Sequence, residues 1–343
     1  MKGNHFDCKT VENNHYNNNP FVNFYNNKRK LLIKIISIII IAINFFILKV
    51  YFNSLNIIPK TKFKFDKNFD YIHYQKGFIS KKILNEANWM MNVDDAYIIN
   101  GLIRKYKPKN CLEIGVAKGG SSILILNAIK DIADSQLVSI DLFSSLFGHK
   151  IGYLVEEKFP ELMNKWKLFV GDMAHKFLIK LNLKFDFLFL DTAHVAPGEF
   201  FNLIESLPFL KENAIIVLHD IMWHLEKVFV MNNNLTIARI MPTQIFLMSS
   251  LNGEKIMFPK TSNKFINVGV ICLEEKQEKY YLNYFLLFLT VWHYMPTHKQ
   301  LIDLRKFISK YYHSKIFLNI FDTAVNYNKN FFKGINESGY TFF

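Results

Sequence analysis

The sequence predicts an α/β fold built on a doubly wound, mostly parallel sheet of seven strands. Strand-like and helix-like segments alternate from residue 109 to about residue 273, which is typical of such sheets. The strand-like segments are short, unbroken apolar runs, as expected of strands buried on both faces. A glycine-bearing turn joins the first strand of this series to the next helix. With 343 residues, 50% of them hydrophobic, the chain can bury one sizeable domain and still carry additional segments.

Seven short segments are expected to form the strands. Their ranges are 109–114, 136–141, 167–170, 185–190, 213–219, 244–250 and 266–273. Two helices are expected before the first strand, at 80–91 and 94–106, because apolar residues recur there at helical spacing. A third helix, at 121–129, follows the glycine-bearing turn.

The N-terminal part of the chain differs in composition from the rest. Residues 1–30 are polar and rich in asparagine, so we expect a disordered tail. Residues 31–52 are almost entirely apolar and long enough to span a bilayer as a helix, with Lys34 and Lys49 near the ends. A buried or interfacial helix is the alternative, although an isoleucine-rich segment offers no polar face. Residues 53–65 are predicted to be a basic linker.

Charge and cysteine content exclude several classes of protein. The formal net charge is +13, but there is no long lysine or arginine block, so nucleic-acid binding is not expected. Basic residues flank the predicted span on both sides, which suits anionic lipid and leaves the orientation open. Cys8, Cys111 and Cys272 are far apart and form no Cys-x-x-Cys motif, so a disulfide framework is not expected and a reducing compartment fits.

The glycine-bearing turn is the most informative motif of the chain. Glu113 ends the apolar lead-in, Gly115, Gly119 and Gly120 follow, and Ser121 opens the next helix. Glycines let the backbone approach a ligand closely, and a helix N-terminus offers free N–H groups. The spacing is Glu-x-Gly-x-x-x-Gly, so the dinucleotide fingerprint is absent. The turn therefore predicts a nucleotide-like cofactor that is not a dinucleotide, with a purely structural turn as the alternative.

The motif resembles the first motif of the class I S-adenosylmethionine (SAM)-dependent methyltransferases. Its form, Glu-Ile-Gly-x-x-x-Gly-x-Ser, is similar to that of the small-molecule O-methyltransferases related to catechol O-methyltransferase. The resemblance covers about residues 95–275. It implies a Rossmann-like methyltransferase fold that ends in an antiparallel hairpin. It also implies SAM as the cofactor, bound by Glu113, Gly115, Gly119, Gly120 and Ser121.

Acidic residues follow the second and third predicted strands. Asp141 lies about 20 residues beyond Gly119, where a carboxylate can accept hydrogen bonds from ribose hydroxyls. Asp172 ends the third strand, and an Asp there resembles the adenine-contacting residue of the family. For both residues the alternative is a structural turn or helix-capping role.

The ends of the fourth and fifth predicted strands carry the residues expected to do chemistry. If these strands are neighbours, Asp191 and Asp220 converge and can bind a divalent cation such as Mg²⁺. The resemblance implies metal ligands at these positions, but the asparagine expected after the second Asp is Ile221 here. His194 stands where the family places a catalytic lysine, and a histidine can act as general base. Strand alternation predicts that His219 points away from Asp220.

The leading hypothesis is a membrane-anchored O-methyltransferase that acts on a small-molecule, sugar or envelope-glycan hydroxyl. Residues 66–275 are then the methyltransferase-like domain, with its first helices covering the cofactor, and SAM use places this domain in the cytoplasm. One alternative is a binding or scaffold module that keeps the fold without activity. Another is a relative with different chemistry, because the Asp-x-x-His and His-Asp pairs also resemble a branch with sugar O-methyltransferases and cephalosporin hydroxylase-type proteins.

The C-terminal part of the chain, residues 276–343, is expected to be a helical, aromatic extension. Its segment Tyr280–Met295 is short for a bilayer span and contains Asn283 and His293. We expect it to pack as a helix on the domain, on a second copy in a homo-oligomer, or on a bilayer surface. Among the other polar residues, His175 is expected to be structural.

Overall fold

The computed structural model describes most of the chain from residue 61 onward. The described ranges are 61–65, 79–87, 91–146, 148–192, 194–221, 243–258, 266–274 and 277–337. The predicted tail and the predicted span at 31–52 lie outside them. Within the described ranges, no helix combines the length and the apolar character that crossing a bilayer requires.

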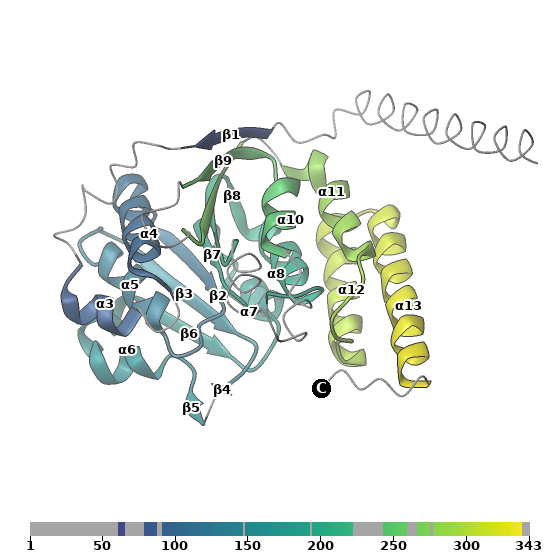
Figure 1. Ribbon diagram of the computed structural model, residues 1–343, viewed down its shortest axis with the longest axis horizontal. Helices are drawn as coiled ribbons and strands as arrows, with labels where there is room; N and C mark the ends of the chain where they lie inside the picture. The colour runs from purple at the N-terminus through teal and green to yellow at the C-terminus, as the bar shows by residue number, and fades with distance from the viewer. Residues whose placement is uncertain are drawn as a thin grey trace, which may run out of the picture. The chain divides into compact units, whose positions relative to one another are not determined.

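One large sheet forms the centre of the domain, in the strand order β1-β9-β10-β8-β7-β2-β3-β6 (Figure 1). The strand bounds are β1 Thr61–Phe65, β2 Asn110–Ile114, β3 Gln136–Asp141, β6 Trp166–Val170, β7 Phe185–Leu190, β8 Leu210–His219, β9 Gly253–Met257 and β10 Val268–Leu273. β10 runs antiparallel to both of its neighbours, and the other pairs are parallel. The predicted doubly wound, mostly parallel sheet with a late antiparallel hairpin is confirmed.

Two predictions about the strands were wrong. Residues 244–250 belong to a helix, α10 (Thr243–Ser250), and the strand of this region is β9, a few residues later. A short apolar run fits a buried helix as well as a buried strand, so periodicity could not separate them. The predicted linker contributes β1, which pairs in parallel with β9 and makes the sheet eight strands wide.

Helices cover both faces of the sheet (Figure 1). One face packs against α3 (Lys81–Ala87), α4 (Val93–Tyr106), α5 (Gly120–Ile129) and α6 (Tyr153–Lys158). The other packs against α7 (Ala174–Leu181), α8 (Gly198–Ser206) and α10. Successive residues of β2 face opposite layers. Cys111 packs in the core on the side of α3–α6, and Leu112 packs in the core on the side of α7, α8 and α10. This double burial explains the unbroken apolar runs.

The C-terminal extension packs on the side of the sheet that carries α7, α8 and α10. Its described part has five helical segments, of which the last is the longest. They are a 3₁₀ turn at Gln277–Tyr280, α11 (Tyr281–Leu286), a 3₁₀ turn at Leu287–Leu289, α12 (His298–Tyr312) and α13 (Lys315–Glu337). The single helix expected over Tyr280–Met295 therefore ends at Leu289. Beyond it, Asn328 Oδ1 accepts a hydrogen bond from the Trp292 backbone N–H at 2.7 Å, so a neighbouring helix replaces the intrahelical partner.

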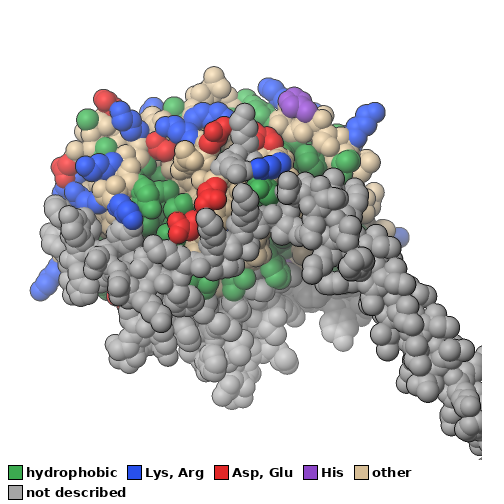
Figure 2. Space-filling view, turned by 90° about the horizontal axis from the view of Figure 1, so that it is seen from above, with side chains coloured by type: hydrophobic (Ala, Val, Ile, Leu, Met, Phe, Trp, Pro, Cys, Tyr) green, Lys and Arg blue, Asp and Glu red, His purple; other side chains and the backbone are tan. Residues whose placement is uncertain are grey.

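Charged side chains are mixed on the described surface that Figure 2 displays. Lysine and arginine side chains alternate there with acidic ones and do not gather in one block.

Strand register brings the candidate site residues to one edge of the sheet. Ile114 at the end of β2 is level with Ile140 on β3 and Leu190 on β7, and Leu190 is level with Leu218 on β8. The residues that follow these positions therefore emerge together, as is usual for ligand sites of open α/β sheets.

Candidate active site

The glycine turn between β2 and α5 passes close to its neighbours at two positions. Gly115 has a φ of 90°, and a Cβ atom there would lie 1.7 Å from the backbone oxygen of Asp191. Gly119 has a φ of 98°, and a Cβ there would lie 3.1 Å from the Cα of Gly152. Only glycine fits the first position, because any side chain would collide with the end of β7.

Glu113 holds the turn from below and does not line the cavity. Its carboxylate accepts hydrogen bonds from the hydroxyls of Ser121 and Ser122 at 2.6 Å and of Ser139 at 2.5 Å. The side chain is fully buried, and burial raises its pKa to about 7 although the three hydroxyls act to lower it. Glu113 thus ties the first turn of α5 to β3 and positions the cofactor turn, whereas we had expected it to contact the cofactor.

Asp141, at the end of β3, organises the upper part of the turn. One carboxylate oxygen accepts hydrogen bonds from the backbone N–H groups of Val116 at 2.9 Å and Ala117 at 3.1 Å. The other accepts one from the Phe143 N–H at 2.9 Å. A carboxylate offers about four acceptor positions. Asp141 therefore fixes the turn and keeps part of its accepting capacity for a ligand.

A cavity of about 300 Å³ opens above the turn and the strand ends. Most of the predicted site residues line it, namely Gly115, Gly120, Ser121, Asp141, Asp172, Asp191 and His194. Gly119, Glu113 and Asp220 are not part of the lining. The structure thus brings the predicted cofactor residues and the predicted chemical residues to one cavity.

Asp172 lines this cavity, and its side chain is 39% exposed, against 12% for Asp191 and 14% for His194. Burial acts to raise its pKa, but the Met173 backbone N–H and the Lys176 ammonium outweigh this and lower it. Lys176 lies 3.1 Å from Asp172 and 2.7 Å from Asp303 of α12. The Asp172 carboxylate is thus ionised and is held by a lysine that also binds the extension.

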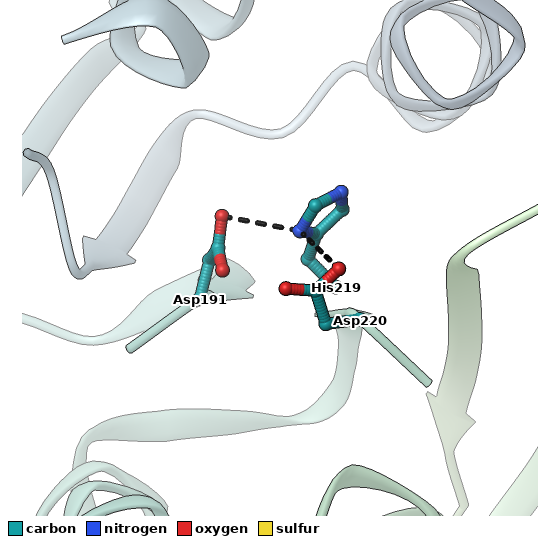
Figure 3. A group of neighbouring side chains, drawn as sticks. All are labelled: Asp191, His219 and Asp220. Carbon is teal, nitrogen blue, oxygen red and sulfur yellow. Dashed lines mark ion pairs between the residues drawn. The ribbon is translucent and has the colours of Figure 1, made fainter. Parts of the chain in front are cut away.

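Asp191, His219 and Asp220 form a compact group at the ends of β7 and β8 (Figure 3). The Nδ1 atom of His219 lies 3.2 Å from Asp191 Oδ2 and 3.5 Å from Asp220 Oδ1. Asp220 has a φ of 60°, so the backbone leaves the extended conformation directly after His219. This turn is why the prediction from strict alternation was wrong and both side chains face the same group.

His194 completes the group from the loop after β7. Its Nε2 atom lies 3.1 Å from Asp220 Oδ2 and 3.6 Å from Asp191 Oδ1. Its backbone N–H donates to Glu199 Oε1 at 3.0 Å, and its Nδ1 lies 3.3 Å from the same oxygen. Glu199 is fully buried and also accepts hydrogen bonds from Thr243 and from Gln244. The His194 ring is therefore positioned by α8 and, through Glu199, by α10.

Charges of opposite sign perturb each titrating group in this cluster. Burial acts to lower the pKa of His194, but Glu199, Asp191 and Asp220 raise it to about 9. Burial raises the pKa of Asp220 to about 6. Burial acts to raise the pKa of Asp191 as well, but the adjacent His219 outweighs this and lowers it. The cluster thus holds protons and negative charge side by side, as catalytic sites often do.

Three supporting residues were not predicted from the sequence. Asn267, just before β10, donates a side-chain hydrogen bond to Asp220, and its backbone N–H donates to Asp95 of α4 at 2.9 Å. Asp95 Oδ2 lies 3.7 Å from His219 Nε2. Glu199 has the role described above. Only Asp95, an acidic residue on the buried face of α4, gave a signal, since the site contacts of Asp95 and Asn267 come from distant segments.

The group of Asp191, His219 and Asp220 has a composition that suits a divalent cation. One ligand atom from each residue lies within 4.8 Å of the others. Ile221, where the resembled enzymes have an asparagine, is buried and contacts Gly269 instead. An imidazole among the ligands favours a first-row transition ion over Mg²⁺, which prefers oxygen ligands. The remaining predicted polar residue, His175, is buried with its Nδ1 2.8 Å from Glu205, which agrees with a structural role.

The strand order and the glycine turn, with an acidic residue after β3, define a Rossmann-like domain of the methyltransferase class. Residues 112–221 match the family described as a methyltransferase domain. The match covers about a third of the chain and agrees with the resemblance seen in the sequence. No curated protein matches the chain.

Several solved structures are similar to part of the chain. The O-methyltransferase TomG from Streptomyces achromogenes, solved with SAM, is 14% identical over 59% of this chain and 95% of its own, with a TM-score of 0.42. An O-methyltransferase from Bacillus cereus, solved with SAH (S-adenosylhomocysteine), is 14% identical over 58% and 96%, with a TM-score of 0.43. The SAH-bound methyltransferase PaMTH1 from Podospora anserina is 16% identical over 62% and 99%, with a TM-score of 0.42.

Proposed function

We propose that the protein is a SAM-dependent O-methyltransferase that methylates a hydroxyl of a small molecule, a sugar or an envelope glycan. The observation that carries this proposal is the convergence of Asp191, His194, His219 and Asp220 beside a glycine-turn cavity. A transferase needs a cofactor site and a base within reach of one acceptor atom. The methyltransferase domain match supports the cofactor half of this reading.

The cofactor half of the site fits SAM by shape and charge. The glycine turn leaves the space that a Cβ at Gly115 would fill, and Asp141 keeps accepting capacity for ribose hydroxyls. Carboxylates at Asp141 and Asp172 suit a ligand with cationic and hydroxyl groups. The first turn of α5 adds free backbone N–H groups beside Ser121.

The chemical half of the site can move a proton from the acceptor hydroxyl. When bound, SAM supplies the methyl group, and a cation held by Asp191, His219 and Asp220 lowers the pKa of the hydroxyl. The neutral form of His194 accepts that proton at Nε2. The Glu199 carboxylate acts to raise the pKa of this imidazole, which makes it a stronger base for the acceptor proton. Glu199 keeps the ring oriented during the exchange.

The location of the enzyme follows from the sequence and is part of the proposal. Residues 31–52 anchor the chain in a membrane as a single span, and the domain lies on the cytoplasmic side, where SAM is available. Protease protection of the domain in intact cells, followed by cleavage after lysis, is the expected result. Cleavage from outside intact cells would contradict this orientation.

Cofactor binding is the sharpest test of the proposal. Calorimetry on the full-length protein in detergent micelles should give a SAM affinity, and Asp141→Asn should weaken it by at least about tenfold because a charge-assisted hydrogen bond is lost. Glu212→Gln, an exposed carboxylate on β8, is the matched control and should change nothing. No heat at millimolar SAM with the intact protein would sink the proposal.

A further inference from the structure

Part of the cavity wall comes from outside the matched methyltransferase region. Tyr294, Pro296 and Gln300 of the C-terminal extension line the cavity, together with Asn202 and Glu205 of α8. These five residues are here called the extension wall. The wall adjoins the chemical residues, since the Asn202 side chain donates to the hydroxyl of Thr192, next to Asp191, at 3.1 Å.

The extension wall is held in a defined position. The His293 backbone N–H donates to the carbonyl of Ala196 at 2.8 Å, in the same loop that carries His194. The Gln300 side chain closes a capping box with Thr297 at the start of α12. The first bond joins the extension to the loop that carries the base, and the capping box fixes Gln300 at the start of α12.

Negative charge dominates the cavity. Among the described lining residues the carboxyl side chains are Glu86, Asp141, Asp172, Asp191 and Glu205. The basic ones are Lys118 and His194, and neither belongs to the extension wall. This acidity contrasts with the formal charge of +13 for the whole chain, so it is local to the cavity.

Glu205 gives the extension wall its charge. Its carboxylate is buried, with Oε1 2.8 Å from His175 Nδ1, and it still reaches the cavity lining. Burial, with added repulsion from Glu205 and Glu199, raises the pKa of Tyr294 to about 12. The Tyr294 hydroxyl thus stays neutral and lies within the field of the Glu205 carboxylate. Neutral hydroxyl or ammonium groups are stabilised in such a field, and a second anion is not.

We propose that Glu205 and Tyr294 form an acceptor subsite that selects hydroxyl compounds without negative charge and rejects carboxylated or phosphorylated ones. The inference rests on the proposed O-methyltransferase function and adds the substrate class. The selection is electrostatic, so it separates acceptors of equal size and shape by charge alone.

Three catechols that share one ring and differ only in side-chain charge test this selection. Dopamine is cationic, hydroxytyrosol neutral and 3,4-dihydroxyphenylacetate anionic at pH 7. Their dissociation constants for the SAH-loaded full-length protein are measured by saturation-transfer NMR. The constant of the anion should be at least about tenfold larger than that of either other compound, which is about 1.4 kcal/mol of binding free energy. Equal or tighter binding of the anion, or binding of none of the three, overturns the subsite. Failure to load SAH instead marks failure of the proposed function.

Two variants assign the effect to the extension wall. Glu205→Gln keeps the shape and should shrink the anion penalty to less than about threefold, since the repelling charge is gone. Tyr294→Phe should lower the affinity for all three compounds alike and leave the affinity for SAH unchanged. This second variant tests the subsite even if Glu205→Gln does not fold. Glu212→Gln and Tyr327→Phe, both exposed and away from the cavity lining, are the controls. An unchanged anion penalty in folded Glu205→Gln would refute the assignment.

Discussion

Replacing Glu113 with glutamine tests the role of the carboxylate beneath the cofactor turn. Burial raises its pKa from an ordinary 4.5 to about 7. Between about pH 4.5 and pH 7, Glu113 therefore keeps its proton in the folded protein but has lost it in the unfolded chain. The contribution of this proton to the unfolding free energy is complete below about pH 4.5 and is lost as the pH rises to about 7. A shift of about 2.5 pH units corresponds to about 3 kcal/mol of unfolding free energy.

Urea unfolding of both proteins across pH 4.5 to 8 measures this contribution. Glutamine does not titrate, so Glu113→Gln should lose this part of the pH dependence. The stability of the variant relative to the unchanged protein should then rise by about 3 kcal/mol across the range. The difference between the two proteins isolates Glu113 from Asp220 and His194, which titrate in both. A difference that stays constant with pH would refute the placement of a protonated Glu113 under three serine hydroxyls.

Three further predictions concern the turn, the base and the cation. Gly115→Ala should lower the unfolding free energy in urea by at least about 2 kcal/mol more than Gly148→Ala, because both residues have positive φ but only Gly115 faces the Asp191 carbonyl. The kcat/KM should rise with pH as His194 loses its proton, and His194→Asn should lose this rise, since neutral His194 is the base. Chelation should lower the melting temperature of the unchanged protein by several degrees but not that of Asp220→Asn; equal shifts would argue against the cation.

Local chemistry made the cofactor half of the site predictable from sequence. The runs at Gln136–Asp141 and Phe185–Leu190 form strands with the predicted bounds. Gly115 was predictable because a turn that meets a neighbouring strand tolerates no side chain. Asp191 and Asp220 were predictable because neighbouring parallel strands end at one edge. Each of these inferences needs only the residues of one segment and the assumption that successive β-strands lie side by side in the sheet.

The rest of the site depends on contacts that no local pattern records. His219 turned toward Asp220 because a left-handed residue follows it, and Asp220 gave no signal for that conformation. Asn267 takes part through Asp220, 47 residues away, and Glu199 is itself held by Thr243, 44 residues away. Glu113 stands in sequence where a ligand contact is expected, but its carboxylate oxygens accept hydrogen bonds from three serines of α5 and β3 instead. The role of a polar residue is thus fixed by partners that come together only in the fold.

The bond between Ala196 and His293 has a consequence for how the enzyme is made. During synthesis the glycine turn leaves the ribosome about 180 residues before His293. The sheet is also incomplete until β10 inserts between β8 and β9. The nascent chain therefore carries its base and acidic residues on an open surface until the final helices dock. A chain cut before Tyr294 by proteolysis or a premature stop loses part of the cavity wall, so residues far from the glycine turn in sequence contribute to the site.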